Sequence, residues 1–504
     1  DATNNPTITL IANAQVGGTL TLTSGTLDLA ANTLTIAGSV SRTNGNIDAD
    51  AGTISFANTN NLSLPTSLFS GNIYNLSKAS GAGTVTLNDN LTVTNLLTNA
   101  VSTGAFIIAT SKELTVSGTG KATIDGTLTN NGTFTLNSGA TLLQGSGSSI
   151  TGGTYNVQQN VTGSGGSTPN GRFWYLGSPL SNSSSSALLS YTGDQVWEWN
   201  ESNFAYATVP TGQTLSQGKS YVLRSGQTTG VIHFLGTGLS NGNITISGLT
   251  RTGTTQTYRG CHLISNPYPS YLDWNAICSN TGTTNIGTTM YVRTAVGSTI
   301  DVMETFNSVG NIATNNSGTP LTQYIAPMQG FWVKVAADGQ TGSLTMNNTM
   351  RSHQPTGSGL RSTPQDFPAF LRFNMLDGQN KDQVILLMSP DATMSLDAFD
   401  SEKMSASGYA QFYSTVNAKK LVINGMKNVK AKTSVPLTLE MPSSKSYTFQ
   451  AEEFNIEDGL ILLEDKQEGV IQDLTINPTY SFFGNAGTNA TRFVVHFQLA
   501  NAPT

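Results

Sequence analysis

Apolar and polar residues alternate in short runs along the first third of the chain. Residues 18–29 (GTLTLTSGTLDL) and 126–136 (GTLTNNGTFTL) are two examples. A period of two is typical of a half-buried β-strand, because successive side chains point to opposite faces of a sheet. Each run ends near glycine, asparagine or serine, which favour tight turns. Short strands that recur without helices between them predict a β-solenoid over residues 1–165. A flat β-sandwich is the alternative for this part.

The pattern changes after a Gly/Ser-rich joint at residues 162–171. All five tryptophans fall between residues 170 and 335. Alternating runs such as 195–199 (QVWEW) and 330–335 (GFWVKV) mark strands in the same part of the chain. We therefore expect an aromatic-cored β domain over residues 170–350.

A second polar joint, at residues 353–364, leads to a third region. Alternating runs such as 370–375 (FLRFNM) and 492–497 (RFVVHF) recur there, and no helical period separates them. This arrangement predicts an antiparallel β-sandwich over residues 361–504. The expected fold class is all-β throughout.

The number and distribution of charged residues limit the functions that the sequence supports. Charged residues make up 11% of the chain, and the formal net charge is −6. Nucleic-acid binding needs clustered lysine and arginine to displace phosphate counterions, and the sequence has no such cluster. No apolar run reaches the roughly 18 residues of a membrane-spanning helix. We expect neither a nucleic-acid partner nor a membrane span.

The two cysteines, Cys261 and Cys278, enclose a stretch rich in proline and aromatic residues (CHLISNPYPSYLDWNAIC). A disulfide that closes a loop of this size stabilises a protein by roughly 3 kcal/mol in the chain-entropy model. Disulfides are common in extracellular proteins, and we expect one here. Two buried free thiols are the alternative. With the proline-fixed turn, the bridge would staple the central domain.

Catalytic candidates are sparse. The four histidines belong to unrelated stretches, and the sequence has neither a His-Glu-x-x-His zinc motif nor a Gly-x-Ser-x-Gly nucleophile elbow. His262 follows Cys261, but adjacent strand residues point to opposite faces, which separates a nucleophile from its base. Residues 1–170 carry 4 basic and 7 acidic groups, too few for the charged groove of a polysaccharide lyase. We expect that the protein is not an enzyme.

A few aromatic and acidic residues are candidates for carbohydrate contacts. Glu198 lies between Trp197 and Trp199, and aromatic walls can hold a sugar ring beside an acid. In a strand, however, the two tryptophans share one face and Glu198 takes the other. Further candidate glycan contacts, with a place in the core as their alternative, are Tyr268, Tyr271 and Trp274.

Calcium is the one cofactor that the sequence suggests. Asn46, Asp48 and Asp50 present oxygens at alternate positions. The segment has two carboxylates and lacks a complete calcium-loop signature, so a solvated turn is the simpler interpretation. We otherwise expect no cofactor.

Several stretches resemble motifs of large secreted surface proteins of Bacteroidetes-type bacteria. In the first two regions they are the threonine-leucine repeats, residues 263–274 (LISNPYPSYLDW) and residues 325–335 (IAPMQGFWVKV). The third region resembles the β-sandwich that often precedes the secretion signal of such proteins, through residues 397–403 (DAFDSEK), 421–424 (LVIN), 462–466 (LLEDK) and 492–497 (RFVVHF). The resemblance implies export by the type IX secretion machinery, which uses a C-terminal sorting domain. No sorting domain is visible here, as expected of a processed or shortened chain.

We therefore expect a non-catalytic extracellular protein with a structural or adhesive role at the bacterial surface. The terminal coil of a solenoid exposes strand edges that need a cap. The chain begins with the strand-like residues Thr7, Ile8, Thr9, Leu10 and Ile11, which favours assembly into a homo-oligomer or filament, or donation of this strand to a partner's sheet. The alternative is a secreted protein that binds or degrades carbohydrate, with a surface polysaccharide as its partner.

Overall fold

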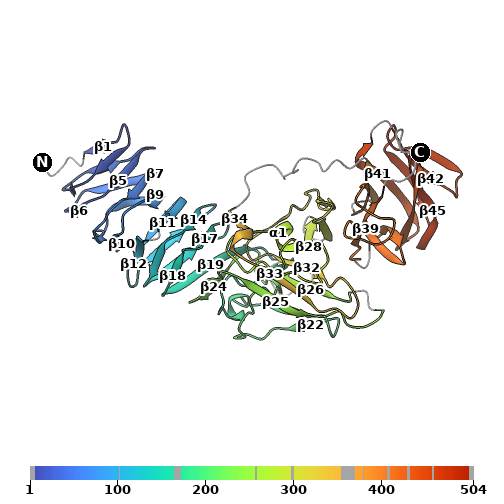
Figure 1. Cartoon of the computed structure of the whole chain (residues 1–504), viewed down its shortest axis with the longest axis horizontal. Coiled ribbons are helices and arrows are strands. Elements are labelled where there is room, and N and C mark those ends of the chain that lie inside the picture. The colour runs from blue at the N-terminus through green and yellow to red at the C-terminus, as the bar shows by residue number, and fades with distance from the viewer. Residues whose placement is uncertain are drawn as a thin grey trace.

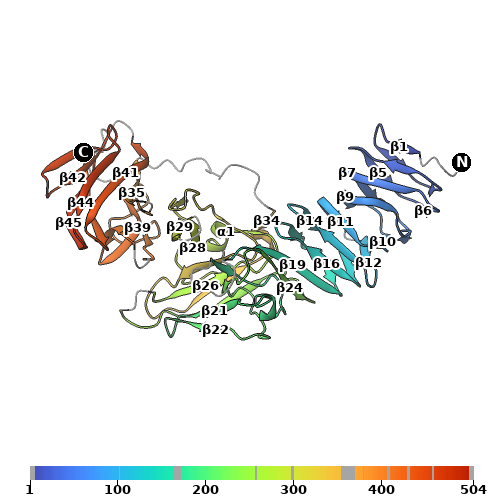
Figure 2. The ribbon, with the colours of Figure 1, turned by 180° about the vertical axis from the view of Figure 1, so that it is seen from behind.

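Three β-rich regions follow one another along an elongated molecule. The computed structural model is 56% strand and 2% helix, and it describes residues 6–101, 103–163, 172–255, 258–296, 300–353, 369–378, 380–405, 409–427, 432–456 and 459–498. Residues 164–171 and 354–364 of the two predicted joints lie outside these ranges. The first strand and the C-terminal sheet lie at opposite ends (Figure 1), and the reverse view shows the same order (Figure 2). The predicted all-β fold is confirmed.

The N-terminal region is a β-solenoid of about 7 turns. Its main sheet stacks parallel strands in the order β1 (Thr7–Thr9), β4 (Thr26–Asp28), β7 (Asn46–Phe56), β9 (Phe69–Lys78), β11 (Leu91–Asn99), β13 (Glu113–Val116), β16 (Thr133–Leu136) and β19 (Thr154–Val161). A second parallel sheet contains β8 (Leu62–Ser63), β10 (Thr84–Leu87), β12 (Ala105–Ile108), β15 (Thr127–Asn130) and β18 (Ser149–Thr151). The turns are completed by β2 (Ala14–Val16), β3 (Thr19–Leu22), β5 (Thr33–Ile36), β6 (Ser39–Arg42), β14 (Lys121–Ile124) and β17 (Thr141–Gln144).

Stacked apolar side chains fill the solenoid. Leu114 pairs in register with Phe134, which pairs with Tyr155 one turn further on, and all three side chains are buried. The threonines of β15, Thr127 and Thr129, are partly exposed. The period of two in the sequence therefore separates the core from the surface.

Buried polar side chains link neighbouring turns. Asn58, Asn99 and Asn130 each donate a side-chain N–H to a backbone carbonyl of a following turn, at 2.8–2.9 Å. Lys78 is fully buried, and its ammonium donates to three backbone carbonyls, including that of Gly81 at 2.7 Å. Burial lowers the pKa of Lys78. These bonds satisfy backbone groups that the turns would otherwise leave unpaired inside the coil.

The central region combines several small sheets. A four-stranded sheet has the order β20 (Phe173–Leu176), β23 (Tyr221–Arg224), β21 (Gln195–Asn200) and β22 (Ala205–Thr208), and a five-stranded sheet has the order β26 (Cys261–Ser265), β32 (Gly330–Lys334), β28 (Thr289–Val296), β29 (Ile300–Asn307) and β30 (Ile312–Ala313). Other elements are β24 (Gly230–Gly236), β25 (Ile244–Leu249), β27 (Tyr271–Asp273), β31 (Tyr324–Ile325), β33 (Gly342–Met346), β34 (Arg351–Ser352), α1 (Trp274–Cys278), η1 (Ser185–Ala187) and η2 (Asn348–Met350). Within the described residues, no helix has the length and apolar character needed to cross a membrane.

The C-terminal region is one 11-stranded sheet that curls until it is nearly closed. Its order is β43 (Val470–Asp473), β42 (Leu460–Asp465), β45 (Gly487–Gln498), β40 (Lys432–Met441), β38 (Gln411–Val416), β39 (Lys419–Met426), β36 (Asn380–Met388), β35 (Ala369–Asp377), β41 (Lys445–Ile456) and β44 (Thr479–Gly484), with β37 (Ser401–Glu402) paired to β39. Neighbouring strands are antiparallel except β36 and β39. The sheet encloses packed rings that include Phe373, Phe412, Phe449 and Phe493.

Candidate functional site

The proline-rich stretch between the cysteines forms a buried scaffold. Asn266 donates its side-chain amide to the Ser270 carbonyl at 2.7 Å and accepts the Tyr268 N–H at 3.0 Å, which closes the Asn-Pro-Tyr-Pro turn. The Asp273 carboxylate caps α1 by accepting the Asn275 N–H at 2.8 Å. Side chains of the segment itself therefore stabilise its turn and the start of α1.

This scaffold caps the C-terminal end of the solenoid, and we call the junction the first seam. β24 pairs antiparallel with the last solenoid strand, β19, and the Pro269 carbonyl accepts the N–H of Leu142 at 2.7 Å. One continuous hydrophobic core runs from the solenoid into the central region, where it includes Leu176, Tyr221 and Phe234. The backbone pairing and the shared core make the two regions one packed body.

Arg351 is the central side chain of the first seam. Its guanidinium donates to the Leu142 carbonyl at 2.8 Å, to Gln144 Oε1 at 3.0 Å and to the hydroxyl of Ser270 at 2.8 Å, and it lies 4.5 Å from the centroid of the Tyr268 ring. The residue is 8% exposed, and burial lowers its pKa to about 10. Arg351 thus joins the last solenoid turns to the Asn-Pro-Tyr-Pro turn.

His353 adds a second link at this seam. Its two ring nitrogens lie 3.0 Å from the hydroxyl of Thr123 and 2.7 Å from that of Thr141, on two consecutive solenoid turns. Burial, together with the charges of Lys121 and Arg351, lowers the pKa of His353 to about 4. The imidazole is therefore neutral at pH 7.

The predicted disulfide is wrong, because Cys261 and Cys278 are both free thiols. Cys261 packs in a cluster with Leu263 on one face of β26, whereas Cys278 packs against the core that contains Ile264. Leu263 and Ile264 are consecutive strand residues and point to opposite faces. The sheet therefore separates the two sulfur atoms. Burial raises the thiol pKa values to about 11 for Cys261 and about 12 for Cys278.

The tryptophans of β21 lie on an aromatic face. Trp197 and Trp199 both pack against the cluster that contains Cys261, and the Trp199 indole N–H donates to the Cys261 carbonyl at 2.8 Å. Glu198 lies between them in sequence and forms an ion pair with Lys219 at 2.7 Å. Sequence reasoning missed the rings that complete this face, Tyr206 and Tyr258, which lie against Trp199.

The other candidate glycan contacts lie within the central core or beside it. Tyr268 and Trp274 have no exposed surface, so neither can offer a ring face to a sugar. The Trp274 indole N–H donates to the Thr288 carbonyl at 2.9 Å. Tyr271 is partly buried in β27, and burial raises its pKa. His262 Nε2 donates a 2.7 Å hydrogen bond to the Thr250 carbonyl, and burial lowers the pKa of His262.

The predicted assembly strand lies at the solenoid end opposite the first seam. β1 pairs with β4 along one edge. Ile8 is 65% exposed and Ile11 is 98% exposed, whereas Leu10 packs partly against the solenoid core. Thr7 and Thr9 are exposed.

The candidate calcium ligands lie at the start of β7. Asp48 Oδ1 accepts the N–H of Asp50 at 3.3 Å, and Asn46 begins the strand. Across the described ranges, no three His, Cys, Asp or Glu side chains are grouped to hold a metal ion.

The central region meets the C-terminal sheet at a second seam that combines polar contacts with a small apolar cluster. Asn307 donates to the Ala398 carbonyl at 3.0 Å, and the Tyr291 hydroxyl donates to the Glu402 carbonyl at 2.8 Å. Lys334 forms an ion pair with the Glu402 carboxylate at 2.5 Å. The C-terminal sheet keeps its own main core, and a smaller apolar cluster of this region packs against Val309 and Ile312 of the central region.

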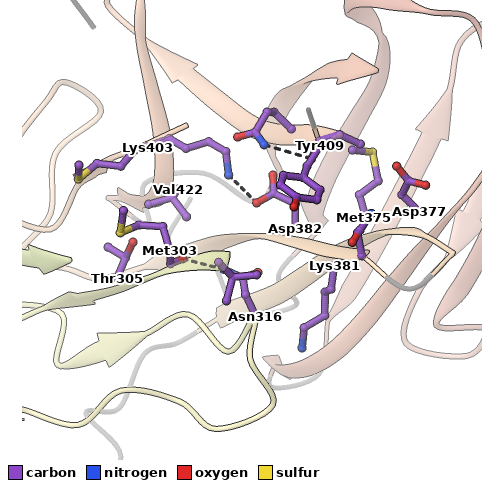
Figure 3. A pocket seen from close by; sticks show the side chains of 15 residues that line it. Met303, Thr305, Asn316, Met375, Asp377, Lys381, Asp382, Lys403, Tyr409 and Val422 are labelled. Atoms are coloured by element: carbon purple, nitrogen blue, oxygen red, sulfur yellow. Dashed lines mark hydrogen bonds and ion pairs between the residues drawn. The ribbon is translucent and has the colours of Figure 1, made fainter. Parts of the chain in front are cut away.

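A cavity of about 50 Å³ lies within the second seam (Figure 3). Met303 and Asn316 line it from the central region, and Asp382 and Lys403 line it from the C-terminal sheet. Burial raises the pKa of Asp382, although its 2.7 Å ion pair with Lys403 opposes that shift. A volume of this size suits about one to three water molecules and is too small for an organic ligand.

Comparison with known proteins places the chain in a family. A family model described as "Domain of unknown function (DUF8693)" matches residues 77–497. The protein belongs to this family. The DUF8693 span begins in β9 and ends in β45, so it contains both seams. No curated protein and no solved structure matches the chain.

The Arg351 contacts at the first seam of this DUF8693 protein have no signal in the sequence. Arg351 lies 207 residues from Gln144, and neither residue belongs to a recognisable motif. The paired residues become visible once the fold brings β17 and β34 together.

Proposed function

We propose that this protein is a non-catalytic extracellular component of a bacterial surface, with a structural or adhesive role. The observation that carries the proposal is the end-to-end arrangement of the three regions in an elongated molecule (Figure 1). The first seam joins the solenoid to the central region by strand pairing and a shared core. Such a body can hold a binding surface away from the point where it is attached. The resemblance of residues 263–274 and 325–335 to motifs of type IX cargo supports export by that route.

Self-assembly is part of the proposal. The exposed side chains of Ile8 and Ile11 supply apolar area that a second copy, or a partner's sheet, would remove from water. The strand edge of β1 that does not face β4 offers backbone groups for the same contact.

Electron microscopy of the native protein, with antibody labelling of intact cells, tests this proposal. We expect labelled cell surfaces and elongated particles that join into oligomers or filaments. A protein confined to the cytosol would overturn the surface role. A strictly monomeric full-length protein would overturn assembly, and polymers that persist after deletion of residues 1–12 would exclude the strand-donor contact.

Saccharide binding is the second candidate function. Tyr206 and Tyr258 expose 43% and 37% of their surface beside Trp199, and exposed rings of this kind suit sugar contacts. Carbohydrate degradation has less support, because Glu198 is already paired with Lys219. Substitution Tyr206→Ala should weaken binding on a glycan array while folding remains intact. Unchanged binding would remove this aromatic face from consideration.

A further inference from the structure

The two ends of the solenoid differ in how their apolar core is covered. At the C-terminal end, β24 pairs antiparallel with β19, and the core residues Tyr155 and Val157 of β19 are buried. At the N-terminal end, β1, β2 and β3 form the first coil and pair with β4, β5 and β6 of the second coil. Their other edges have no strand partner among the described residues. The solenoid therefore has one capped end and one open end.

A column of core side chains shows what the open end leaves exposed. Ile47 is fully buried, Leu27 lies in register with it and is partly buried, and Ile8 lies in register with Leu27 and is 65% exposed. Residues in register on parallel strands point to the same side of the sheet, so Ile8 occupies a core position that nothing in the described structure covers. Other apolar residues of the first coil that pack only partly against the core are Leu10, Val16 and Leu20.

The open end also carries no charge. Residues 6–27, which include the whole first coil, contain no Asp, Glu, Lys, Arg or His. Exposed strand edges of monomeric proteins are usually protected by charged side chains, and this coil has none. In a contact between two copies related by a two-fold axis, each residue lies near its own equivalent, so like charges would repel. A neutral apolar end suits such a contact.

The capped end decides how a second copy can bind. Head-to-tail stacking would place the open end of one solenoid on the last coils of another, where β24 and the Arg351 contacts already lie. Two open ends, however, can meet each other. A two-fold axis through the middle of β1 brings this strand antiparallel to β1 of the second copy, and β2 of each copy then faces β3 of the other. The β19–β24 pair shows that an end of this solenoid accepts an antiparallel strand.

We propose that two copies of this chain bind head to head through the first solenoid coil and form a closed two-fold dimer. Ile8 and Ile11 of both copies are then removed from water. The inference rests on the self-assembly proposed above and names its partner and geometry. Because a two-fold contact uses the open end of both copies, assembly stops at the dimer. The surface role can fail separately, because location is measured on cells and dimerisation on the purified protein.

Sedimentation velocity of the purified full chain, over a range of concentrations, tests the proposal. We expect a monomer in equilibrium with a species of twice its mass. Electron microscopy of the larger species should show two solenoids joined in the middle and a C-terminal sheet at each outer end. A strictly monomeric chain would overturn the proposal. Polymers longer than the dimer would also overturn it, while leaving self-assembly in place.

An introduced cysteine tests the symmetry of the contact. A residue near a two-fold axis faces its own equivalent, so Ile8→Cys should form an intermolecular disulfide with itself under mild oxidation. Ile471→Cys is the matched control, because Ile471 is 63% exposed but lies in the C-terminal sheet at the other end of the molecule (Figure 1). It should not link to itself, and the wild-type chain gives the background from Cys261 and Cys278. Disulfides between Ile8→Cys and Ile471→Cys chains in a mixture, without Ile8→Cys self-linkage, would overturn the proposal.

Charge placed at the open end tests the apolar contact. Ile8→Lys and Ile11→Lys each bring two like charges into the interface, so each should weaken dimerisation by at least about tenfold. Ile476→Lys, at a position that is 82% exposed in the C-terminal region, should leave dimerisation unchanged. The melting temperature of each variant checks folding. Equal weakening by Ile8→Lys and Ile476→Lys, or an unchanged dimer in Ile8→Lys, would overturn the proposal.

Discussion

The two seams of the molecule are built from different interactions. At the first seam, β24 extends the solenoid sheet and one hydrophobic core crosses the junction. At the second seam, polar contacts such as Asn307 to the Ala398 carbonyl, together with a small apolar cluster, join two regions whose main cores are separate. Apolar burial stabilises a junction in proportion to its area, whereas each exchanged hydrogen bond contributes only about 0.5–1.5 kcal/mol net.

This difference assigns different mechanical roles to the seams. The solenoid and the central region cannot separate without breaking a sheet and exposing a core, so we expect them to unfold together. The C-terminal sheet can separate with its main core intact, although this exposes the small cluster that packs against Val309 and Ile312. The molecule therefore has one body formed by the solenoid and the central region, and one terminal region held by polar contacts and a small apolar cluster.

Loss of the Arg351 side chain should have the largest effect. Arg351→Met keeps the volume but leaves the Leu142 carbonyl and Gln144 Oε1 without their donor inside a buried junction. We expect a loss of about 3 kcal/mol in the unfolding free energy of the solenoid and central region. Denaturant unfolding followed by tryptophan fluorescence measures it, since all five tryptophans lie in the central region.

Arg372→Met is the matched control at the second seam. Arg372 is also 8% exposed, and it donates across that seam to the Ala313 carbonyl. This variant should leave the tryptophan transition within about 1 kcal/mol of the wild type. Equal effects of the two substitutions would contradict the distinction between the seams.

Asn307→Ala should have an intermediate effect, confined to the second seam. The side chain is fully buried, and it also accepts the Val309 and Gly310 N–H groups at 3.0 and 2.8 Å. We expect a loss of about 2 kcal/mol in seam stability and a faster release of the C-terminal region from the central region in limited proteolysis. An unchanged cleavage rate would show that apolar contacts hold this seam.

Acid should weaken the first seam through His353. The folded-state pKa of about 4 lies below the usual value near 6.5, so the unfolded chain binds the proton more tightly. Stability is then complete above about pH 6.5 and falls as the pH drops toward 4. We expect a loss of about 1–2 kcal/mol, after allowing for solvent screening. The unfolding free energy of His353→Gln, measured as a function of pH, should fall less with acid than that of the wild type. Identical profiles would contradict the role given to His353.

The smallest effect concerns the thiols. Because the five-stranded sheet separates Cys261 from Cys278, dithiothreitol should leave the melting temperature unchanged. Their raised pKa values keep both protonated at pH 8, so iodoacetamide should modify them slowly until the chain unfolds. A melting temperature lowered by reductant would indicate a bridge.

The sequence predicts the parts of this molecule whose signal is local. Leu114, Phe134 and Tyr155 stack because each lies in a run with a period of two, and that period is visible without the structure. The disulfide prediction failed because sequence spacing does not say on which face of a sheet each cysteine lies. Arg351 could not be singled out, because its partners come from distant turns and strands. Long-range pairing decides the structure of both seams.

Native-state hydrogen exchange, followed peptide by peptide in increasing denaturant, tests the central claim that the first seam makes one body and the second seam joins two. We expect peptides from β16–β19 and from β24–β26 to share one opening free energy, and peptides from β38–β40 to have another. Arg351→Met should lower the first value alone. Separate values for the solenoid and central peptides, or a single value for all three regions, would contradict the account.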